Sequence, residues 1–162
     1  MTGSRIDFVT GAPEKYAHLV DRLSTAPDRL RASVAGRSNA DLRREPADGN
    51  WSIARILAHL AVVIPRNGRF IYQMGTMTDP ARMPFVEADE AERLQHVNPE
   101  SNLATIEAAV AEVVEFLSHT PDASWGRPGR KNGLRRSLRQ EVTALADHFD
   151  EHIEEIGRQL RG

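Results

Sequence analysis

The sequence predicts an all-α protein built as a four-helix bundle, and three observations support this fold class. Apolar residues recur at spacings of three and four along four segments, each of about 20 residues. No segment alternates apolar and polar residues with the period of a β-strand. The connections are long, above all Gly75 to Val97, so neighbouring helices need not run antiparallel.

The first predicted helix spans Pro13 to Val34. Its apolar residues stay in helical phase on both sides of Pro27, although this proline removes one backbone donor and predicts a kink. Gly36 is a usual helix stop. The segment Ser38 to Arg44 then predicts a single helical turn.

The second predicted helix begins after Ser52, whose hydroxyl is a favourable N-cap. We expect Trp51 to pack against Ile56, four positions into the helix. The apolar stripe continues to Met74. A bend is expected at Pro65, because its ring displaces a bond to the carbonyl four residues earlier.

The third and fourth predicted helices have clear start signals. Asn98 followed by Pro99 opens the third, which ends before Pro121. Ser137 with Gln140 forms a capping box that opens the fourth. The apolar stripe of the fourth helix consists of Leu138, Val142, Leu145, Phe149, Ile153, Ile156 and Leu160.

Length and composition limit the class of protein. A chain of 162 residues has the size of one domain, so we expect residues 1–162 to share one core. A formal net charge of -2 with 27% charged residues argues against a nucleic-acid partner. No long apolar run and no signal-like N-terminal segment are visible, which predicts a cytoplasmic protein with no membrane partner.

Three histidines are candidates for a metal site. The chain has no cysteine, so any metal must bind His, Asp or Glu. His148 and His152 are four residues apart on one helix, and their side chains share a face beside the apolar stripe. His59 lies at the edge of the second helix's stripe. Three neutral imidazoles with an open position suit zinc, and also nickel or iron. Glu141 and Glu155 are candidates for orienting the imidazoles.

The histidine spacing alone leaves a plainer interpretation open. A helical His pair is more often solvated or hydrogen-bonded on the surface than bound to metal. The three imidazoles could simply form hydrogen bonds with one another and with water. His18 is expected on the surface, and His119 as a cap of a helix C-terminus. His96, in the long crossover, is a loop histidine or overhangs the site. A basic cluster is either a solvated loop or a contact for an anionic group; it comprises Arg127, Arg130, Lys131, Arg135, Arg136 and Arg139.

Competing metal and nucleophile motifs are missing. A zincin needs HExxH, whereas Phe149 follows His148. A di-iron bundle needs Glu-x-x-His motifs, and the sequence contains none. Because the sequence has neither a cysteine nor a GxSxG motif, it offers no candidate nucleophile for the usual catalytic triads.

Two segments resemble a known family. Asn50-Trp51-Ser52-Ile53, leading to Ile56-Leu57-Ala58-His59-Leu60, is similar to the Trp-Ser-Ile…Leu-x-His-Leu signature of DinB/YfiT-like proteins. The segment from Asp147 to His152 resembles that family's final HxxxH helix, and a loop with Trp125 precedes it. The resemblance implies an up-down-down-up bundle, often a homodimer, with a divalent metal bound by His59, His148 and His152.

The resemblance also sets the expected function. The family is similar to bacillithiol S-transferases and mycothiol-dependent maleylpyruvate isomerase, which implies a metal-dependent enzyme that activates a low-molecular-weight thiol or a water. A thiol would have to arrive as a cosubstrate, since the chain has no cysteine. The alternative is a non-catalytic metal-binding or stress-response dimeric bundle. The sequence names no particular small-molecule substrate.

Overall fold

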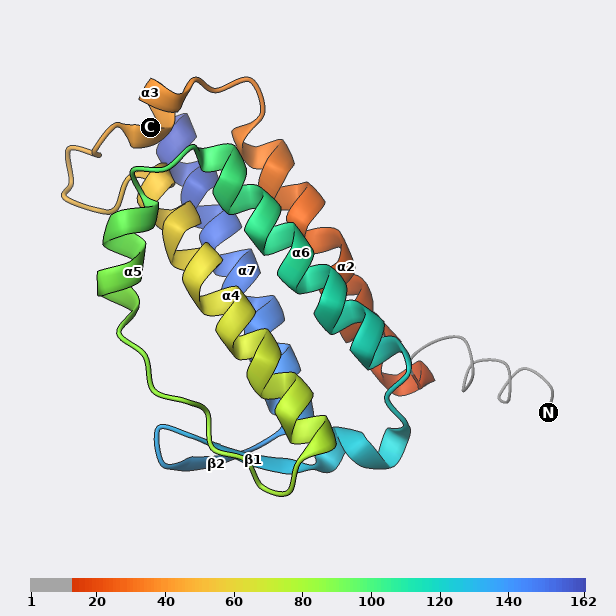
Figure 1. The fold of residues 1–162 in the computed structure, drawn as a ribbon. Helices are drawn as coiled ribbons and strands as arrows, with labels where there is room; N and C mark the ends of the chain where they lie inside the picture. The colour runs from red at the N-terminus through yellow and green to blue at the C-terminus, as the bar shows by residue number, and fades with distance from the viewer. Residues whose placement is uncertain (1–12) are drawn as a thin grey trace.

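The computed structural model describes residues 13–162, and four long helices form its body (Figure 1). They are α2 (Glu14–Val34), α4 (Ile53–Thr76), α6 (Pro99–Ser118) and α7 (Leu138–Arg161). Helices α2 and α7 point towards one end of the bundle, and α4 and α6 point towards the other. The predicted all-α, up-down-down-up four-helix bundle is therefore confirmed.

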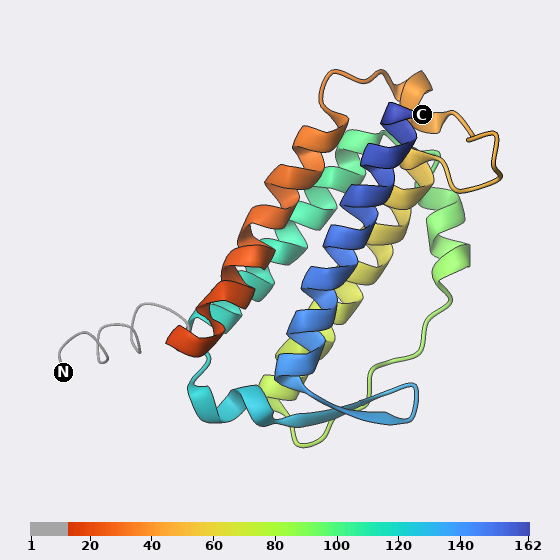
Figure 2. The ribbon, with the colours of Figure 1, turned by 180° about the vertical axis from the view of Figure 1, so that it is seen from behind.

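Neighbouring helices of the bundle are parallel in two of the four pairs. Helix α4 packs against α6 and α7, and α2 packs against the same two helices. The view from behind shows α2 beside α7 and α7 beside α4 (Figure 2). Because α4 and α6 run the same way, residues 77–98 must return along the bundle between them. This is the long crossover that the sequence indicated.

The core fills the space between the four helices. Burial of the apolar side chains of this core is the main stabilising term for the bundle, at about 25 cal/mol per Å² of apolar surface. Fully buried residues from all four helices include Leu23, Leu30, Ile56, Leu60, Phe70, Ile106, Val142 and Phe149. Within residues 13–162, no helix combines the length and apolar character needed to cross a membrane.

The predicted helix starts are confirmed by their caps. The Ser52 hydroxyl accepts a hydrogen bond from the backbone of the third helical residue of α4. Ser137 and Gln140 form the reciprocal capping box of α7, and Asn98 caps α6 ahead of Pro99. The short turn is α3 (Asn39–Arg43), while Pro27 and Pro65 lie inside continuous helices. Polar side chains thus cap the starts of α3, α4, α6 and α7, whereas α2 begins after Pro13 without a side-chain cap.

The structure contains a short β-hairpin, although the sequence analysis found no strand pattern. Strands β1 (Pro128–Lys131) and β2 (Leu134–Ser137) pair antiparallel after a short 3₁₀ turn, η1 (Asp122–Gly126). Half of the residues in these strands are basic, and the strands carry no apolar alternation. The hairpin depends instead on its two-residue turn, Asn132-Gly133, whose φ values of 54° and 78° suit this pair of residues.

The long crossover is held against this hairpin. It contains a short helix, α5 (Glu87–Leu94), that the sequence analysis did not predict. Before α5, the backbone N–H of Arg82 donates to the Arg130 carbonyl, and the backbone N–H of Arg130 donates to the Pro80 carbonyl. The N···O distance is 2.8 Å in both hydrogen bonds. Crossover and hairpin therefore form one continuous cover across an end of the bundle (Figure 1).

The two tryptophans have different surroundings. Trp125 is fully buried, stacks on Tyr16 with 4.3 Å between ring centroids, and donates from Nε1 to the Thr120 carbonyl. Trp125 is therefore a packing residue of the core. Trp51 is 41% exposed, and its ring lies 4.2 Å from the Arg55 guanidinium and 5.2 Å from the His59 ring. Trp51 thus borders the histidine cluster described next.

Candidate metal centre

The three histidines singled out in the sequence come together between α4 and α7. One ring nitrogen from each of His59, His148 and His152 lies within 4.8 Å of the other two. His148 and His152 share a face of α7 because they are one helical turn apart, and His59 reaches them from α4. The ring centroids are 5.1 Å apart for His59 and His148, 4.9 Å for His59 and His152, and 4.6 Å for His148 and His152.

Two carboxylates fix the orientation of two of these rings. Nδ1 of His59 lies 3.0 Å from Glu87 Oε1, and Nδ1 of His152 lies 3.0 Å from Glu155 Oε2. An ionised carboxylate only accepts, so each Nδ1 carries the proton and each Nε2 keeps its lone pair. Nε2 of His148 lies 2.9 Å from Nε2 of His59. Since Nε2 of His59 has no proton, Nε2–H of His148 donates to it in the metal-free protein, and a bound metal ion would take the place of this shared proton.

Glu155 was predicted as an orienting group, whereas Glu87 was not. Glu87 is the first residue of α5, and Arg55 binds it in a bidentate pair of 2.7 and 3.0 Å. Hydrogen bonding from Arg55 lowers the pKa of Glu87, which keeps it ionised beside His59. An acidic first turn on α5 was the available signal, but the sequence does not show where the crossover folds.

The prediction that Glu141 orients an imidazole is wrong. Its side chain is 2% exposed and accepts hydrogen bonds from Arg136 Nε at 2.6 Å and Lys131 Nζ at 3.3 Å. Glu141 lies two turns before His148 on α7, directly beneath the hairpin. The basic residues of the hairpin reach it there, so its carboxylate is occupied.

The other described histidines stay outside the cluster. His18 is exposed on α2, as predicted. His119 follows the end of α6, and its Nδ1 lies 3.0 Å from the Glu115 carbonyl, which confirms its role at the helix terminus. His96 is exposed on the crossover, lies 3.6 Å from Glu92 and is not part of the three-histidine cluster.

Burial favours the neutral form of His59 and His148. Desolvation, with the nearby His152 and His59 rings, lowers the pKa of His148 to about 4. Desolvation also lowers the pKa of His59, against the opposing effect of Glu87. At neutral pH these rings therefore offer lone pairs in place of positive charges.

This depressed pKa predicts how the metal-free protein responds to acid. Between pH 6.5 and about 4, His148 stays neutral when folded but takes up a proton when unfolded. Protons then favour the unfolded chain, so the free energy of unfolding should fall as pH drops through this window. Urea unfolding at several pH values measures the effect. In His148→Phe the fall should be smaller; an equal fall in both proteins would contradict the prediction.

The fold and the histidine cluster together define a class: four-helix-bundle proteins with a three-imidazole centre between two antiparallel helices. The sequence model of the DinB superfamily matches residues 22–156. The chain therefore belongs to the DinB superfamily, as its motifs predicted.

Two relatives add detail to this assignment. A protein of Geobacillus thermodenitrificans (strain NG80-2) named "Putative metal-dependent hydrolase" is 28% identical over 130 residues, which is 78% of this chain and 72% of that protein. YfiT from Bacillus subtilis, described as "a probable metal-dependent hydrolase with an unusual four-helix bundle topology", has the same fold with a TM-score of 0.80. The match covers 91% of this chain and 88% of YfiT at 19% identity.

Proposed function

We propose that this protein is a metal-dependent hydrolase that binds one divalent ion through Nε2 of His59, His148 and His152 and acts on a small molecule. The convergence of three imidazole nitrogens within 4.8 Å carries the proposal. The names given to the two relatives favour hydrolysis as the reaction. The finer alternatives from the sequence, thiol transfer and a non-catalytic module, are outcomes of the test below.

The donor set fits a divalent ion. Three nitrogens about 2.1 Å from a tetrahedral zinc are roughly 3.4 Å apart, so small ring rotations from the observed arrangement suffice. The carboxylates of Glu87 and Glu155 hold two of the rings in the tautomer that binds metal. Zinc is our first choice, and nickel and iron also suit imidazole.

The surroundings of the three rings suit catalysis as well as binding. Bound at three neutral ligands, a divalent ion lowers the pKa of a coordinated water or thiol towards neutrality. The protein's own part is to keep His59 and His148 uncharged by burial and to orient His59 and His152 through their carboxylate partners. Trp51 and Arg55 lie beside His59 and border the centre on the side of the α4 N-terminus.

The function is tested by activity of the purified protein loaded in turn with zinc, nickel and iron(II). We expect hydrolysis of at least one member of a panel of activated esters and amides, and no hydrolysis by His152→Ala. Reaction only when a low-molecular-weight thiol and an electrophile are supplied would replace hydrolysis with thiol transfer. Stoichiometric metal without turnover of any substrate would favour the non-catalytic module.

Light scattering tests the homodimer, which we propose from the family resemblance.

The carboxylate beside His59 should contribute to metal affinity. Glu87→Gln removes the charge that holds the Nδ1 proton, and such changes typically weaken binding by about 10- to 100-fold. Competition with a chromophoric zinc chelator measures the change. The matched control is Glu90→Gln, one turn further along α5, where the carboxylate binds Arg66 at 2.7 Å. Equal affinities for both variants would show that Glu87 does not support the centre.

A further inference from the structure

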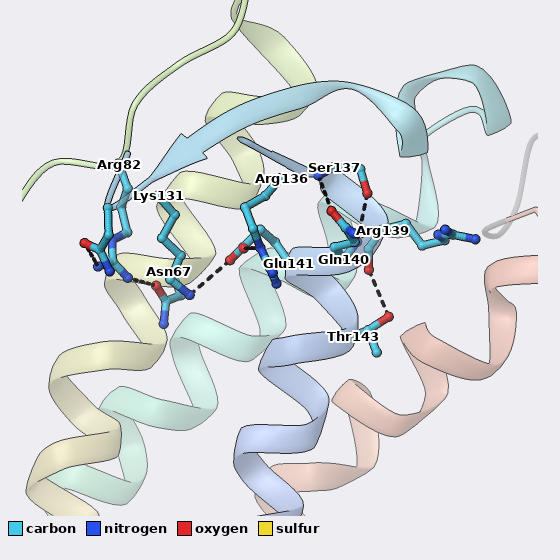
Figure 3. A network of polar contacts seen from close by, with 10 residues as sticks. Asn67, Arg82, Lys131, Arg136, Ser137, Arg139, Gln140, Glu141 and Thr143 are labelled. Carbon is cyan, nitrogen blue, oxygen red and sulfur yellow. Dashed lines mark hydrogen bonds and ion pairs between the residues drawn. The ribbon is translucent and has the colours of Figure 1, made fainter. Parts of the chain in front are cut away.

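Three basic side chains gather beneath the hairpin, between α4 and α7 (Figure 3). Arg82 comes from the crossover, Lys131 from β1 and Arg136 from β2. They surround the buried carboxylate of Glu141 on α7 and the amide of Asn67 on α4. Five elements, namely α4, the crossover, β1, β2 and α7, thus contribute to one polar cluster.

The cluster carries more positive than negative charge. Arg136 lies 2.6 Å from Glu141, and this pair alone balances the buried carboxylate. Lys131 contacts the other oxygen of Glu141 at the longer distance of 3.3 Å. Arg82 forms no ion pair within residues 13–162; it donates to the amide oxygens of Asn67 at 2.9 Å and Asn132 at 3.4 Å. Three cations therefore surround one anion.

Arg82 is also partly removed from water. Burial lowers the pKa of its guanidinium, which means that its positive charge lacks full compensation by solvent. Its backbone is fixed, because the crossover pairs with Arg130 of β1 on both sides of Ala81. Besides the Phe85 ring, 5.1 Å away, the hydrogen-bond partners of this guanidinium are neutral amides, so a partly desolvated and rigidly placed Arg82 is well suited to bind an anion.

The cluster and the histidines lie along the same pair of helices. Glu141 precedes His148 by seven residues on α7, a rise of about 10 Å. Asn67 follows His59 by eight residues on α4, a rise of about 12 Å. Because α4 and α7 run antiparallel, both displacements point towards the hairpin end of the bundle. The two places are therefore separated mainly along the bundle axis, and the Lys131 ammonium is close enough to act electrostatically on His148.

We propose that Arg82 and Lys131 form a subsite for an anionic group, a carboxylate or a phosphate, of the substrate whose reacting bond lies at the three histidines. The inference rests on the proposed function. Glu141, which is itself held by Arg136, has the supporting role of holding Lys131 in place. The substrate class is then an elongated molecule with an anionic group roughly 10 Å from its reacting bond, the axial spacing of the two sites.

A pair of carboxylic acids tests the arrangement in the zinc-loaded protein. Suberate has a carboxylate at each end of a straight chain, and octanoate has the same length with only one. We expect calorimetry to show suberate binding at least about tenfold more tightly, because its second carboxylate gains charge-assisted hydrogen bonds. Arg82→Gln should abolish this advantage without changing bound zinc. Arg135→Gln, which removes an exposed charge from the same hairpin, should preserve it.

The outcomes separate this subsite from the metal centre. The subsite proposal would be contradicted by equal affinities for suberate and octanoate, or by tighter suberate binding that survives Arg82→Gln. Either result would leave the metal proposal intact. If the protein binds no zinc, the proposed function fails, and the subsite is then tested with inorganic phosphate. Phosphate that raises the melting temperature of the wild type but not of Arg82→Gln supports an anion site. Phosphate with no effect on either protein overturns it.

Discussion

Replacing His148 with alanine should reduce bound zinc from about one ion per chain to less than about a tenth of that after dialysis. The two remaining imidazoles belong to different helices, and neither has a third partner to complete the coordination. Mass spectrometry of the dialysed protein measures the metal directly. Circular dichroism should show an unchanged helical content, because the side chain is only partly buried.

The matched control for this experiment is His119→Ala. His119 lies at the end of α6, outside the cluster, and its loss should leave the zinc content at the wild-type level. Retention of a full equivalent by His148→Ala would refute a three-histidine centre. Absence of metal from the wild type after incubation with zinc, nickel and iron would instead support the interpretation that the histidines only form hydrogen bonds with one another.

The largest loss of stability is expected for Trp125→Ala, at about 3–5 kcal/mol. This substitution leaves a cavity where the indole stacks on Tyr16, and it leaves the Thr120 carbonyl without its donor. Urea unfolding followed by circular dichroism gives the difference. Trp51→Ala is the control, because Trp51 is exposed and mainly contacts Arg55, so its loss should cost about 1 kcal/mol or less. Equal losses for the two variants would contradict the prediction.

The four long helices were predictable because their determinants are local. Ser52, Ser137 and Asn98 cap the following residues, and the apolar stripes repeat with helical spacing over many turns. The hairpin escaped detection because its strands have only four residues each and no apolar alternation. Asn132-Gly133 was its one sequence signal, a pair that strongly favours two-residue hairpin turns.

The candidate centre was predictable only in part, for a related reason. His148 and His152 share a helix, so their proximity follows from helical geometry, and the family signature added His59. Glu155 is one turn from His152 and was accessible in the same way. Glu87 depends on how the crossover folds back onto α4, which no local rule specifies. Glu141 was misassigned because helix periodicity places it on the histidine face but says nothing of the hairpin above it.

The pairing of α2 with α7 has a consequence for synthesis of the protein on the ribosome. The first and last bundle helices lie side by side, and Arg22 of α2 bridges Asp147 and Asp150 of α7 at 2.8 and 2.7 Å. Until α7 leaves the exit tunnel, the nascent helices have an open apolar side and one lone histidine of the three. Assembly of the centre must therefore wait until α7 has emerged and packed against α2 and α4, and until then the open apolar side is prone to aggregation.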